Sequence, residues 1–303
     1  MPPYLRLGSL PRKRHIAHRH EPGFRGEGIY YEEVITVAGF GREWAEYDQS
    51  DLGTHDLRSI FESYFAIFPF DELPAEAEGF DLGCGSGRWA DLVLARVERL
   101  HCIDPSGLAL GVARQRLAGR RGAIFHQASV DDMPLADGSQ DFGYSLGVLH
   151  HVPDTAAAMA ACVRKLKPGA PFLVYLYHSF DNRPFWYRHL WAASDVARKA
   201  ISRMPFPLRR TVTSLIAAVV YWPLARTAKL AERAGRNVVD YPLSIYRDRA
   251  FYVMRTDALD RFGTRLEHRF SRAEIEQIMI AAGLDRIAFS DRPPFWVACG
   301  RRS

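Results

Sequence analysis

The feature that most constrains the fold is a glycine-rich stretch at residues 80–87. A short apolar run leads into three alternating glycines, and a helical pattern follows from Arg88, so we expect a strand, a tight turn and a helix. Glycine allows positive φ and lets a bound group approach the backbone closely. The start of the following helix offers unpaired N–H groups and a partial positive charge. The loop therefore predicts a binding site for a carboxylate or a phosphate.

Strand and helix patterns alternate from this loop to about residue 180. We expect further strands at residues 100–104, 123–127, 141–146 and 171–177. The last of these is almost entirely apolar, as a central parallel strand buried on both faces should be. Ser106 and Asp154 are expected to cap the helices after the second and fourth strands, and Leu108, Val112 and Leu117 to share one face of the first helix. The pattern predicts a doubly wound α/β domain, with a parallel sheet and helices on both faces.

The segments around this core divide the chain into four parts. They are an N-terminal basic head with a helical lid (residues 1–75), the cofactor-binding core (76–180), an inserted helical cap on the substrate side (181–262) and a segment that completes the core (263–303). In the first part, Trp44 and Tyr47 are candidates for a lid over a ligand. The insertion is arginine-rich and dotted with aromatic residues, and it is far too long for a simple connection.

Two further patterns predict regular structure outside the alternating core. Apolar residues recur at spacings of three and four between Leu57 and Phe68, which predicts an amphipathic helix. Ser271 and Glu274 form a capping-box pattern that opens a helix near the C-terminus. Residues 286–289 and 295–300 then predict a β-hairpin at the end of the chain.

Composition narrows the class of protein to which the chain can belong. With 48% hydrophobic and 25% charged residues over 303 positions, the chain resembles an ordinary globular protein. The four cysteines are scattered, with no C-x-x-C pair and no histidine at ligand spacing, so we expect reduced thiols, no metal site and a cytoplasmic location. No apolar run has the length of a signal peptide, and the longest uncharged stretch, residues 211–225, is shorter than the roughly 20 residues that span a bilayer.

The net charge of +5 is unevenly distributed. Residues 1–26 carry six Arg or Lys against one Glu, and residues 181–236 carry eleven against three acidic residues. Such segments are either solvated faces or surfaces for anionic lipid, nucleic acid or phosphorylated substrate. The uncharged stretch flanked by arginines favours peripheral membrane contact through residues 198–236. Nucleic acid is the less favoured partner.

Taken together, the motifs resemble those of class I S-adenosylmethionine-dependent methyltransferases, in the small-molecule branch that includes ubiquinone-type methyltransferases. The segments that carry the resemblance are the glycine loop, Asp104-Pro105-Ser106, and residues 130–135, 141–151 and 166–169. It covers about residues 79–180 and again 268–300. The resemblance implies a Rossmann-like, mostly parallel seven-stranded sheet with an antiparallel terminal strand. It also implies S-adenosylmethionine as the cofactor.

The resemblance also implies a set of cofactor-binding residues. They are Asp81, Gly83, Gly85, Gly87, Asp104, Pro105, Ser106, Val130, Asp131 and Leu146, with Trp44 and Tyr47 of the lid. Asp81 and the glycines would hold the methionine end, and Asp104 would accept hydrogen bonds from the ribose hydroxyls. Val130 and Asp131 would contact the adenine. Ser129 departs from the family, which often has an acid there, and a hydroxyl is a weaker acceptor than a carboxylate.

Methyl transfer itself requires few catalytic side chains. It is an in-line displacement, so positioning supplies much of the rate, and a general base is needed only when the nucleophile starts protonated. His150 and His178 lie at or just beyond the carboxyl ends of predicted strands, where ligands of open α/β sheets collect. Because histidine titrates near neutral pH, both are candidate bases, although a structural role stays open for each.

The favoured function is methylation of a small acceptor, hydrophobic, lipid-linked or glycosylated, with aromatic residues of the insertion lining its pocket and arginines meeting phosphate or carboxylate. One alternative is an NAD-dependent oxidoreductase, whose fingerprint is G-x-G-x-x-G. It is disfavoured because the third glycine, Gly87, falls one place early and Arg88 occupies the deciding position. The other alternative is a module that binds the cofactor without catalysis or docks to a membrane.

Overall fold

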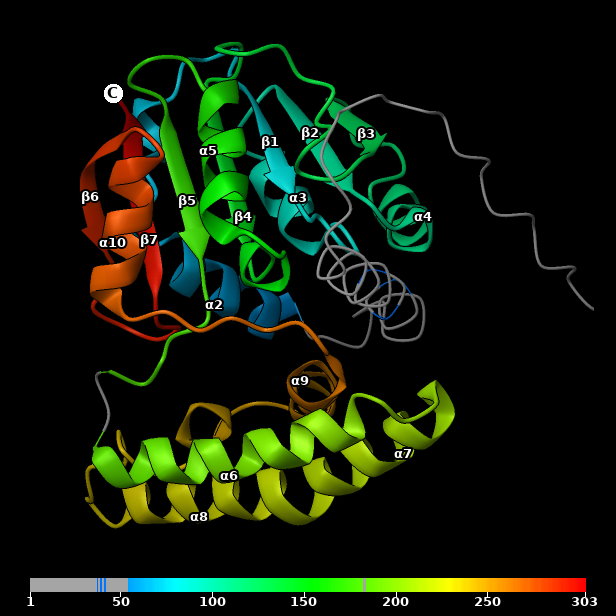
Figure 1. The fold of residues 1–303 in the computed structure, drawn as a ribbon, viewed down its shortest axis with the longest axis vertical. Helices are drawn as coiled ribbons and strands as arrows, with labels where there is room; N and C mark the ends of the chain where they lie inside the picture. The colour runs from blue at the N-terminus through cyan, green and yellow to red at the C-terminus, as the bar shows by residue number, and fades with distance from the viewer. Residues whose placement is uncertain (1–36, 38, 40, 42–53, 182–183) are drawn as a thin grey trace, which may run out of the picture.

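The computed structural model describes residues 37, 39, 41, 54–181 and 184–303, and Figure 1 shows their arrangement. In chain order the elements are α2 (Thr54–Phe65), η1 (Phe70–Glu72), β1 (Glu78–Leu82), α3 (Arg88–Val93), β2 (Arg99–Asp104), α4 (Gly107–Arg116), β3 (Ala123–Gln127), β4 (Phe142–Leu146), η2 (Leu149–His151), α5 (Thr155–Lys165), β5 (Pro171–Tyr175), α6 (Phe185–Ile201), α7 (Phe206–Ile216), η3 (Ala217–Tyr221), α8 (Trp222–Arg233), η4 (Ser244–Tyr246), α9 (Phe251–Gly263), α10 (Arg272–Ala281), β6 (Leu284–Phe289) and β7 (Val297–Arg302). The predicted lid residues Trp44 and Tyr47 lie outside the described residues.

The core is a seven-stranded sheet in the order β3-β2-β1-β4-β5-β7-β6. β7 is antiparallel to its neighbours β5 and β6, and the other neighbouring pairs are parallel. This confirms the predicted mostly parallel sheet with an antiparallel terminal strand. The chain runs from β1 outward to β2 and β3, then crosses to β4 and β5 on the other side. The strand order therefore reverses between β1 and β4, and ligands of open α/β sheets bind at such a switch point.

Helices cover both faces of the sheet. α5 and α10 pack on one face, around the buried rings of Phe80 and Phe172. α2, α3 and α4 pack on the other, where Phe61 and Phe65 of α2 are buried and the ring of Phe61 lies against Trp89 of α3. These phenylalanines confirm the predicted amphipathic helix, and burying each side chain stabilises the fold by about 1.5–3 kcal/mol.

Two glycines bring the central strands β1 and β4 into register. Gly79 pairs with Phe142, and Gly143 pairs with Phe80. A Cβ at Gly79 would lie 2.4 Å from the Phe142 ring, and a Cβ at Gly143 would lie 2.4 Å from the Phe80 ring. Each glycine therefore leaves the space that the opposite phenyl ring fills. This exchange fixes the pairing of the two strands on either side of the switch point.

The predicted helix caps are confirmed by their hydrogen bonds. The side chains of Ser106 and Asp154 each accept the backbone N–H three residues along, at 3.4 and 2.9 Å, at the starts of α4 and α5. Ser271 and Glu274 form the complete capping box at the start of α10. Local side-chain chemistry thus fixes where these helices begin.

The predicted inward face of α4 is only partly right. Leu117 is buried as expected, but Leu108 is 58% exposed, and Ala109, Leu110 and Ala113 are buried instead. The cause is the glycine loop, because a Cβ at Gly87 would lie 3.1 Å from the Cβ of Ala113. Such close packing selects the face of the helix that carries small side chains.

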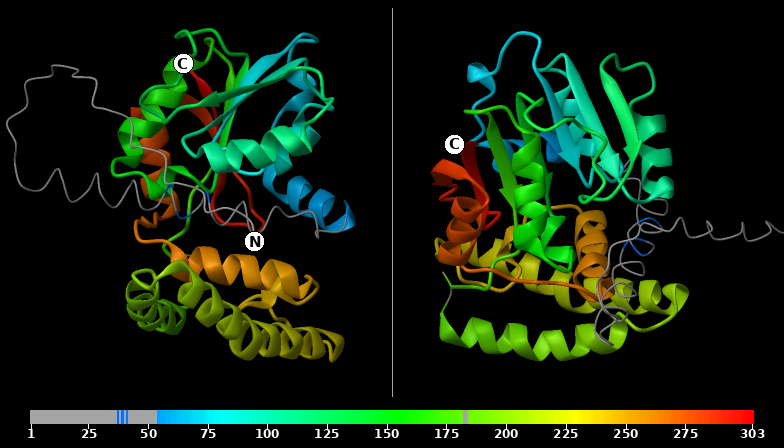
Figure 2. Two further views of the ribbon diagram at one scale, coloured as in Figure 1. Left: turned by 90° about the vertical axis from the view of Figure 1, so that its right-hand side faces the viewer. Right: turned by 45° about the horizontal axis from the view of Figure 1, so that its top comes forward.

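The stretch between β5 and α10 forms a helical cap beyond the carboxyl ends of the parallel strands (Figure 1). α7, η3 and α8 follow one another without a break. η3 is a π-helical turn just before Pro223, which has no N–H to continue the helical ladder. α9 packs against α6, α7 and η3 and lies between these outer helices and the sheet (Figure 2). α9 is therefore the cap helix nearest the carboxyl edge of the sheet.

In the part of the chain that the structure describes, no helix is both long and apolar enough to cross a membrane. The same residues contain no cluster of three or more potential metal ligands. All four cysteines are free and buried.

Candidate cofactor-binding site

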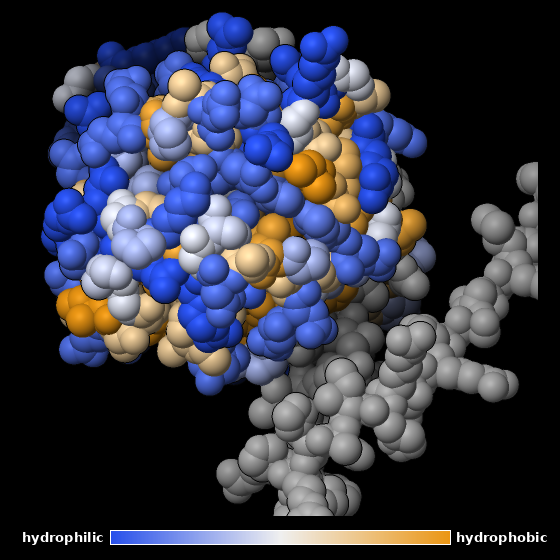
Figure 3. Space-filling model, turned by 90° about the horizontal axis from the view of Figure 1, so that it is seen from above, coloured by the Kyte–Doolittle hydropathy of each residue, from blue (hydrophilic) through white to orange (hydrophobic). Residues whose placement is uncertain are grey.

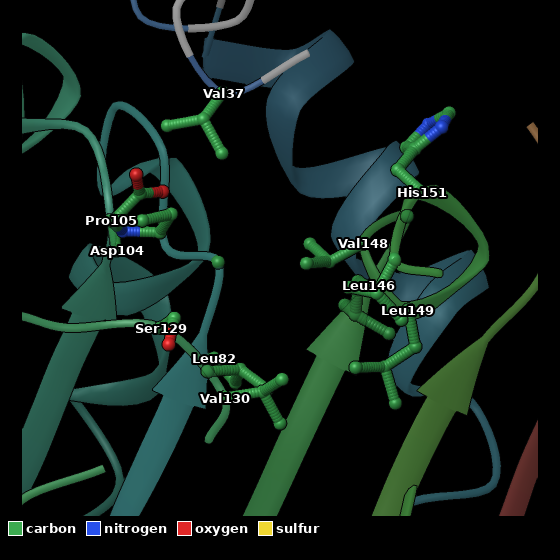
Figure 4. Close-up of a pocket in the computed structure, with 13 residues that line it drawn as sticks. Val37, Leu82, Asp104, Pro105, Ser129, Val130, Leu146, Val148, Leu149 and His151 are labelled. Atoms are coloured by element: carbon green, nitrogen blue, oxygen red, sulfur yellow. The ribbon is translucent and has the colours of Figure 1, made fainter. Parts of the chain in front are cut away.

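A pocket lies at the carboxyl edge of the sheet, at the switch point between β1 and β4 (Figure 4). Leu82 and Gly83 line it at the end of β1, and Asp104 and Pro105 line it at the end of β2. Residues 146–149 line it after β4. The space between these atoms is about 840 Å³, part of it open to solvent.

The glycine loop borders the pocket through Gly83, whereas Gly85 and Gly87 do not line it. Gly83, Gly85 and Gly87 have φ values of +76°, +53° and +72°, a conformation that favours glycine. The N–H of Gly83 donates to the carbonyl of Ile103 at 2.7 Å, which ties the loop to β2. A Cβ at Gly83 would lie 2.3 Å from a methyl group of Val148, so no other residue fits here without displacing the pocket wall.

Asp104 connects the loop to the following helix. One of its oxygens accepts the N–H of Gly85 at 3.0 Å, and the other accepts the N–H of Ser106 at 2.8 Å. Each oxygen keeps a second lone pair, and the side chain lines the pocket. Burial raises the pKa of Asp104 to about 6, while the two N–H groups act in the opposite direction. Asp104 therefore has both a structural role and free acceptor capacity.

Asp81 is buried beneath the same loop at the end of β1. It is 2% exposed, and the hydroxyl of Tyr144 donates to it at 3.0 Å. Burial raises the pKa of Asp81 to about 8, the Tyr144 hydrogen bond lowers it, and the nearby Asp104 raises it further. The carboxyl group is therefore mostly protonated at neutral pH, and a cation bound nearby would favour its ionised form.

The remaining predicted cofactor residues divide into those that line the pocket and those that do not. Val130 and Leu146 line it, together with Ser129. Asp131 is exposed and does not line the pocket, and Ser106 acts as the α4 cap. Sequence reasoning missed Val37, which lies over the pocket opposite β1 and β4 in Figure 4.

The candidate base residues occupy different surroundings. His150 is fully buried and stacks on Tyr177 with ring centroids 3.8 Å apart, and within the described residues neither of its ring nitrogens has a hydrogen-bond partner. Burial and the adjacent His151 lower the pKa of His150 well below its usual range. His178 lies beyond β5 and accepts the N–H of Phe180 at 3.1 Å. The histidine that lines the pocket is His151, which the motif analysis did not select (Figure 4).

A known family of protein domains matches the region that contains the pocket. Residues 80–174 match the family model described as "Methyltransferase domain". This segment is therefore similar to a methyltransferase domain. It contains Gly83 of the glycine loop, Asp104, Val130 and Leu146, which line the pocket.

The chain is also similar to curated proteins and to solved structures. The chain is 37% identical over 146 residues to a ubiquinone biosynthesis O-methyltransferase of Alkalilimnicola ehrlichii, covering 46% of this chain and 57% of the relative. It is 33% identical over 161 residues to the protein of that name from Hahella chejuensis, covering 52% and 64%. A solved SAM-dependent methyltransferase of Thermotoga maritima aligns with 17% identity and a TM-score of 0.47, covering 88% of this chain and all of that one. The chain thus spans little more than half the length of the curated relatives it matches.

Proposed function

We propose that the chain is an S-adenosylmethionine-dependent methyltransferase that acts on a small-molecule acceptor. The observation that carries the proposal is the pocket at the switch point, where Asp104 retains acceptor capacity beside a glycine loop. A methyltransferase domain in this part of the chain supports the same activity.

The residues present fit this cofactor. Asp104 would accept hydrogen bonds from ribose hydroxyls through its remaining lone pairs. Val130 and Leu146 would enclose the adenine and the sulfonium in apolar walls. Asp81 would meet the ammonium of the methionine end, which would compensate a carboxylate that is otherwise costly to ionise.

The cofactor, when bound, supplies an electrophilic methyl group. The chain's own residues orient the reacting groups and exclude water, because the cap covers the carboxyl edge of the sheet (Figure 1). The acceptor would enter between the cap and the sheet. The two curated relatives are named O-methyltransferases, which supports a hydroxyl as the group that is methylated. The aromatic side chains of the cap support a hydrophobic acceptor, lipid-linked or glycosylated.

Isothermal titration with S-adenosylmethionine, S-adenosylhomocysteine and NAD⁺ tests the proposal. We expect one molecule of either sulfur compound to bind per chain and NAD⁺ not to bind. Binding of NAD⁺ in preference to S-adenosylhomocysteine would favour the oxidoreductase, and binding of neither would contradict a cofactor site.

We also propose that the outer face of the cap contacts a membrane surface. Exposed apolar side chains gather on the outer helices, including Trp186 and Leu190 of α6 and Leu215 and Trp222 of α7 and α8. Arg210 of α7 and Arg233 of α8 are exposed and would attract anionic lipid. The opposite end of the molecule is mostly hydrophilic (Figure 3).

Vesicle sedimentation tests this contact. The full chain is expected to bind phosphatidylglycerol vesicles and to bind phosphatidylcholine vesicles more weakly. Trp222→Glu should weaken binding, whereas Leu108→Glu, on the exposed face of α4 in the core, should not. Equal binding by both variants and the wild type would contradict the proposed face.

A further inference from the structure

Two aspartates of α9 face the carboxyl edge of the sheet from the cap. Asp260 accepts a hydrogen bond from the hydroxyl of Tyr177, which lies just past β5. Asp257, one helical turn earlier, accepts a hydrogen bond from the hydroxyl of Tyr246. Neither carboxylate forms a salt bridge with a residue of the described ranges. The pair therefore brings acceptor capacity to the interface between cap and core.

Tyrosines form a continuous wall from the cofactor pocket to this pair. Gly147, which lines the pocket, donates its N–H to the carbonyl of Tyr175 at 3.1 Å. The Tyr175 ring lies 5.1 Å from that of Tyr64 and 5.7 Å from that of Tyr177, measured between centroids. All three tyrosines and Asp257 are half-buried, so each keeps surface that a ligand can contact. An acceptor that reached the cofactor past Gly147 would lie along this wall.

Two contacts hold the segment after α9 against the rim of the pocket. The ring nitrogen Nδ1 of His151 is 2.7 Å from the carbonyl oxygen of Leu266. The N–H of His268 donates to the carbonyl of His150 at 2.9 Å. Because η2 lines the pocket and residues 264–268 follow α9 directly, these bonds fix the position of α9 relative to the cofactor site.

Of the two aspartates, Asp257 has the greater free capacity. Asp260 uses one oxygen for Tyr177, and its other oxygen lies 3.5 Å from the hydroxyl of Thr264. Among the residues that the structure describes, Asp257 has a hydrogen bond from Tyr246 alone. Burial raises the pKa of Asp257 to about 6, whereas the Tyr246 hydrogen bond lowers it. The group is thus ionised at neutral pH and still basic enough to take a proton.

Charged and titratable groups surround Asp257 on every side that the structure describes. They are Asp260 on α9 itself, Arg88 of α3, Tyr64 of α2, Tyr175 of β5, Tyr221 of η3, Tyr246 of η4 and Arg249 after it. The two arginines favour the ionised form of Asp257, and Asp260 disfavours it.

We propose that Asp257 binds the hydroxyl group of the methyl acceptor and takes its proton during transfer. This inference rests on the proposed methyltransferase function. The acceptor oxygen forms the bond to the methyl carbon while the carbon–sulfur bond breaks, the electron pair stays on sulfur, and the hydroxyl proton passes to the Asp257 carboxylate. Asp260 is a positioning residue that holds Tyr177. The acceptor class is an uncharged hydroxyl compound. The two aspartates disfavour a phosphate or carboxylate, and Arg88 and Arg249 already offset the charge of Asp257, so a cation gains little there.

Calorimetry on the full chain saturated with S-adenosylhomocysteine tests the inference, with phenol, benzylamine and phenyl phosphate as probes. We expect phenol to bind more tightly than the cation or the anion. Asp257→Asn should weaken phenol binding about tenfold or more while leaving the affinity for S-adenosylhomocysteine unchanged. Asp248→Asn is the matched control, since Asp248 is on the cap surface, 60% exposed and paired with Lys229. This control should bind phenol as the wild type does.

The pH dependence separates hydroxyl binding by a carboxylate from a purely structural role. In the wild type the phenol affinity should fall as the pH drops through about 6, because protonated Asp257 no longer accepts the hydroxyl. Tyr246→Phe leaves the carboxylate in place and removes a hydrogen bond that stabilises its charge, so the midpoint should move to higher pH.

The outcomes distinguish a failure of the proposed role of Asp257 from a failure of the proposed methyltransferase function. Tighter binding of phenyl phosphate or benzylamine than of phenol, or equal phenol affinity in Asp257→Asn and the wild type, would overturn the role of Asp257. An unshifted midpoint in Tyr246→Phe would overturn it as well. If the wild type fails to bind S-adenosylhomocysteine at all, the proposed function itself fails, and this inference fails with it.

Discussion

Replacing Asp104 by Asn is expected to change stability in a pH-dependent way. The carboxyl group is 8% exposed, and its pKa rises from an ordinary value of 3.8 to about 6 in the folded chain. A raised folded pKa means that the folded state binds the proton more tightly than the unfolded state. The free energy of unfolding of the wild type therefore falls as the pH rises from about 4 through 6. Two pKa units correspond to about 3 kcal/mol.

The amide variant lacks this titration but loses one hydrogen-bond acceptor. Its single side-chain oxygen would accept only one of the two N–H groups of Gly85 and Ser106, and a buried donor left unsatisfied costs about 1–3 kcal/mol. Asp104→Asn should therefore be less stable than the wild type at pH 4. The difference should shrink or reverse by pH 8.

Urea unfolding of both proteins between pH 4 and pH 8 measures this difference. Asp137→Asn is the control, because Asp137 is 62% exposed and its ion pair with Lys165 lies at the surface, where such pairs contribute little to stability. Calorimetry should also show S-adenosylhomocysteine binding about 10- to 100-fold more weakly to Asp104→Asn, since a charged acceptor of the ribose is lost. A stability difference that stays constant from pH 4 to pH 8 would refute the reasoning.

Two further predictions concern the loop and the acid beneath it. Gly83→Ala should weaken S-adenosylhomocysteine binding at least about tenfold, because its Cβ would clash with Val148. The control Gly169→Ala has a similar φ of +80° but lies in open space, so it should destabilise the fold by about 1–3 kcal/mol without affecting binding. Equal affinities of the two variants for S-adenosylhomocysteine in a titration would contradict this prediction. Binding of S-adenosylhomocysteine at pH 7 should release close to one proton, because the pKa of Asp81 is raised to about 8 and the ligand's ammonium favours the ionised form. Calorimetry in buffers of different ionisation enthalpy measures the release, which Asp81→Asn should abolish; release by the variant equal to that by the wild type would exclude Asp81.

Local chemistry made much of the core predictable. The strand at residues 123–127 has the predicted bounds, and Ser106 and Asp154 cap the helices as expected, because capping and alternation depend on residues a few positions apart. The rotation of α4 was not predictable, since it depends on Ala113 meeting the distant Gly87. The same limit applies to His150 and His151, which are neighbours on η2 with different surroundings.

The cap was the least predictable part because its contacts join segments far apart in the chain. Tyr177 and Asp260 are separated by 83 positions, and no spacing rule links them. The sequence suggested the cap arginines as ligands for phosphate or carboxylate. In the structure Arg198 and Arg209 donate to the carbonyls of Thr264 and Gly263, so these two guanidinium groups support the end of α9.

A crystal structure of the full chain with S-adenosylhomocysteine tests the central claim most directly. We predict the ribose hydroxyls within hydrogen-bonding distance of Asp104 and the adenine between Pro105 and Val130, at the switch point of β1 and β4. A ligand bound elsewhere on the chain, or bound here with its ribose turned away from Asp104, would contradict the account.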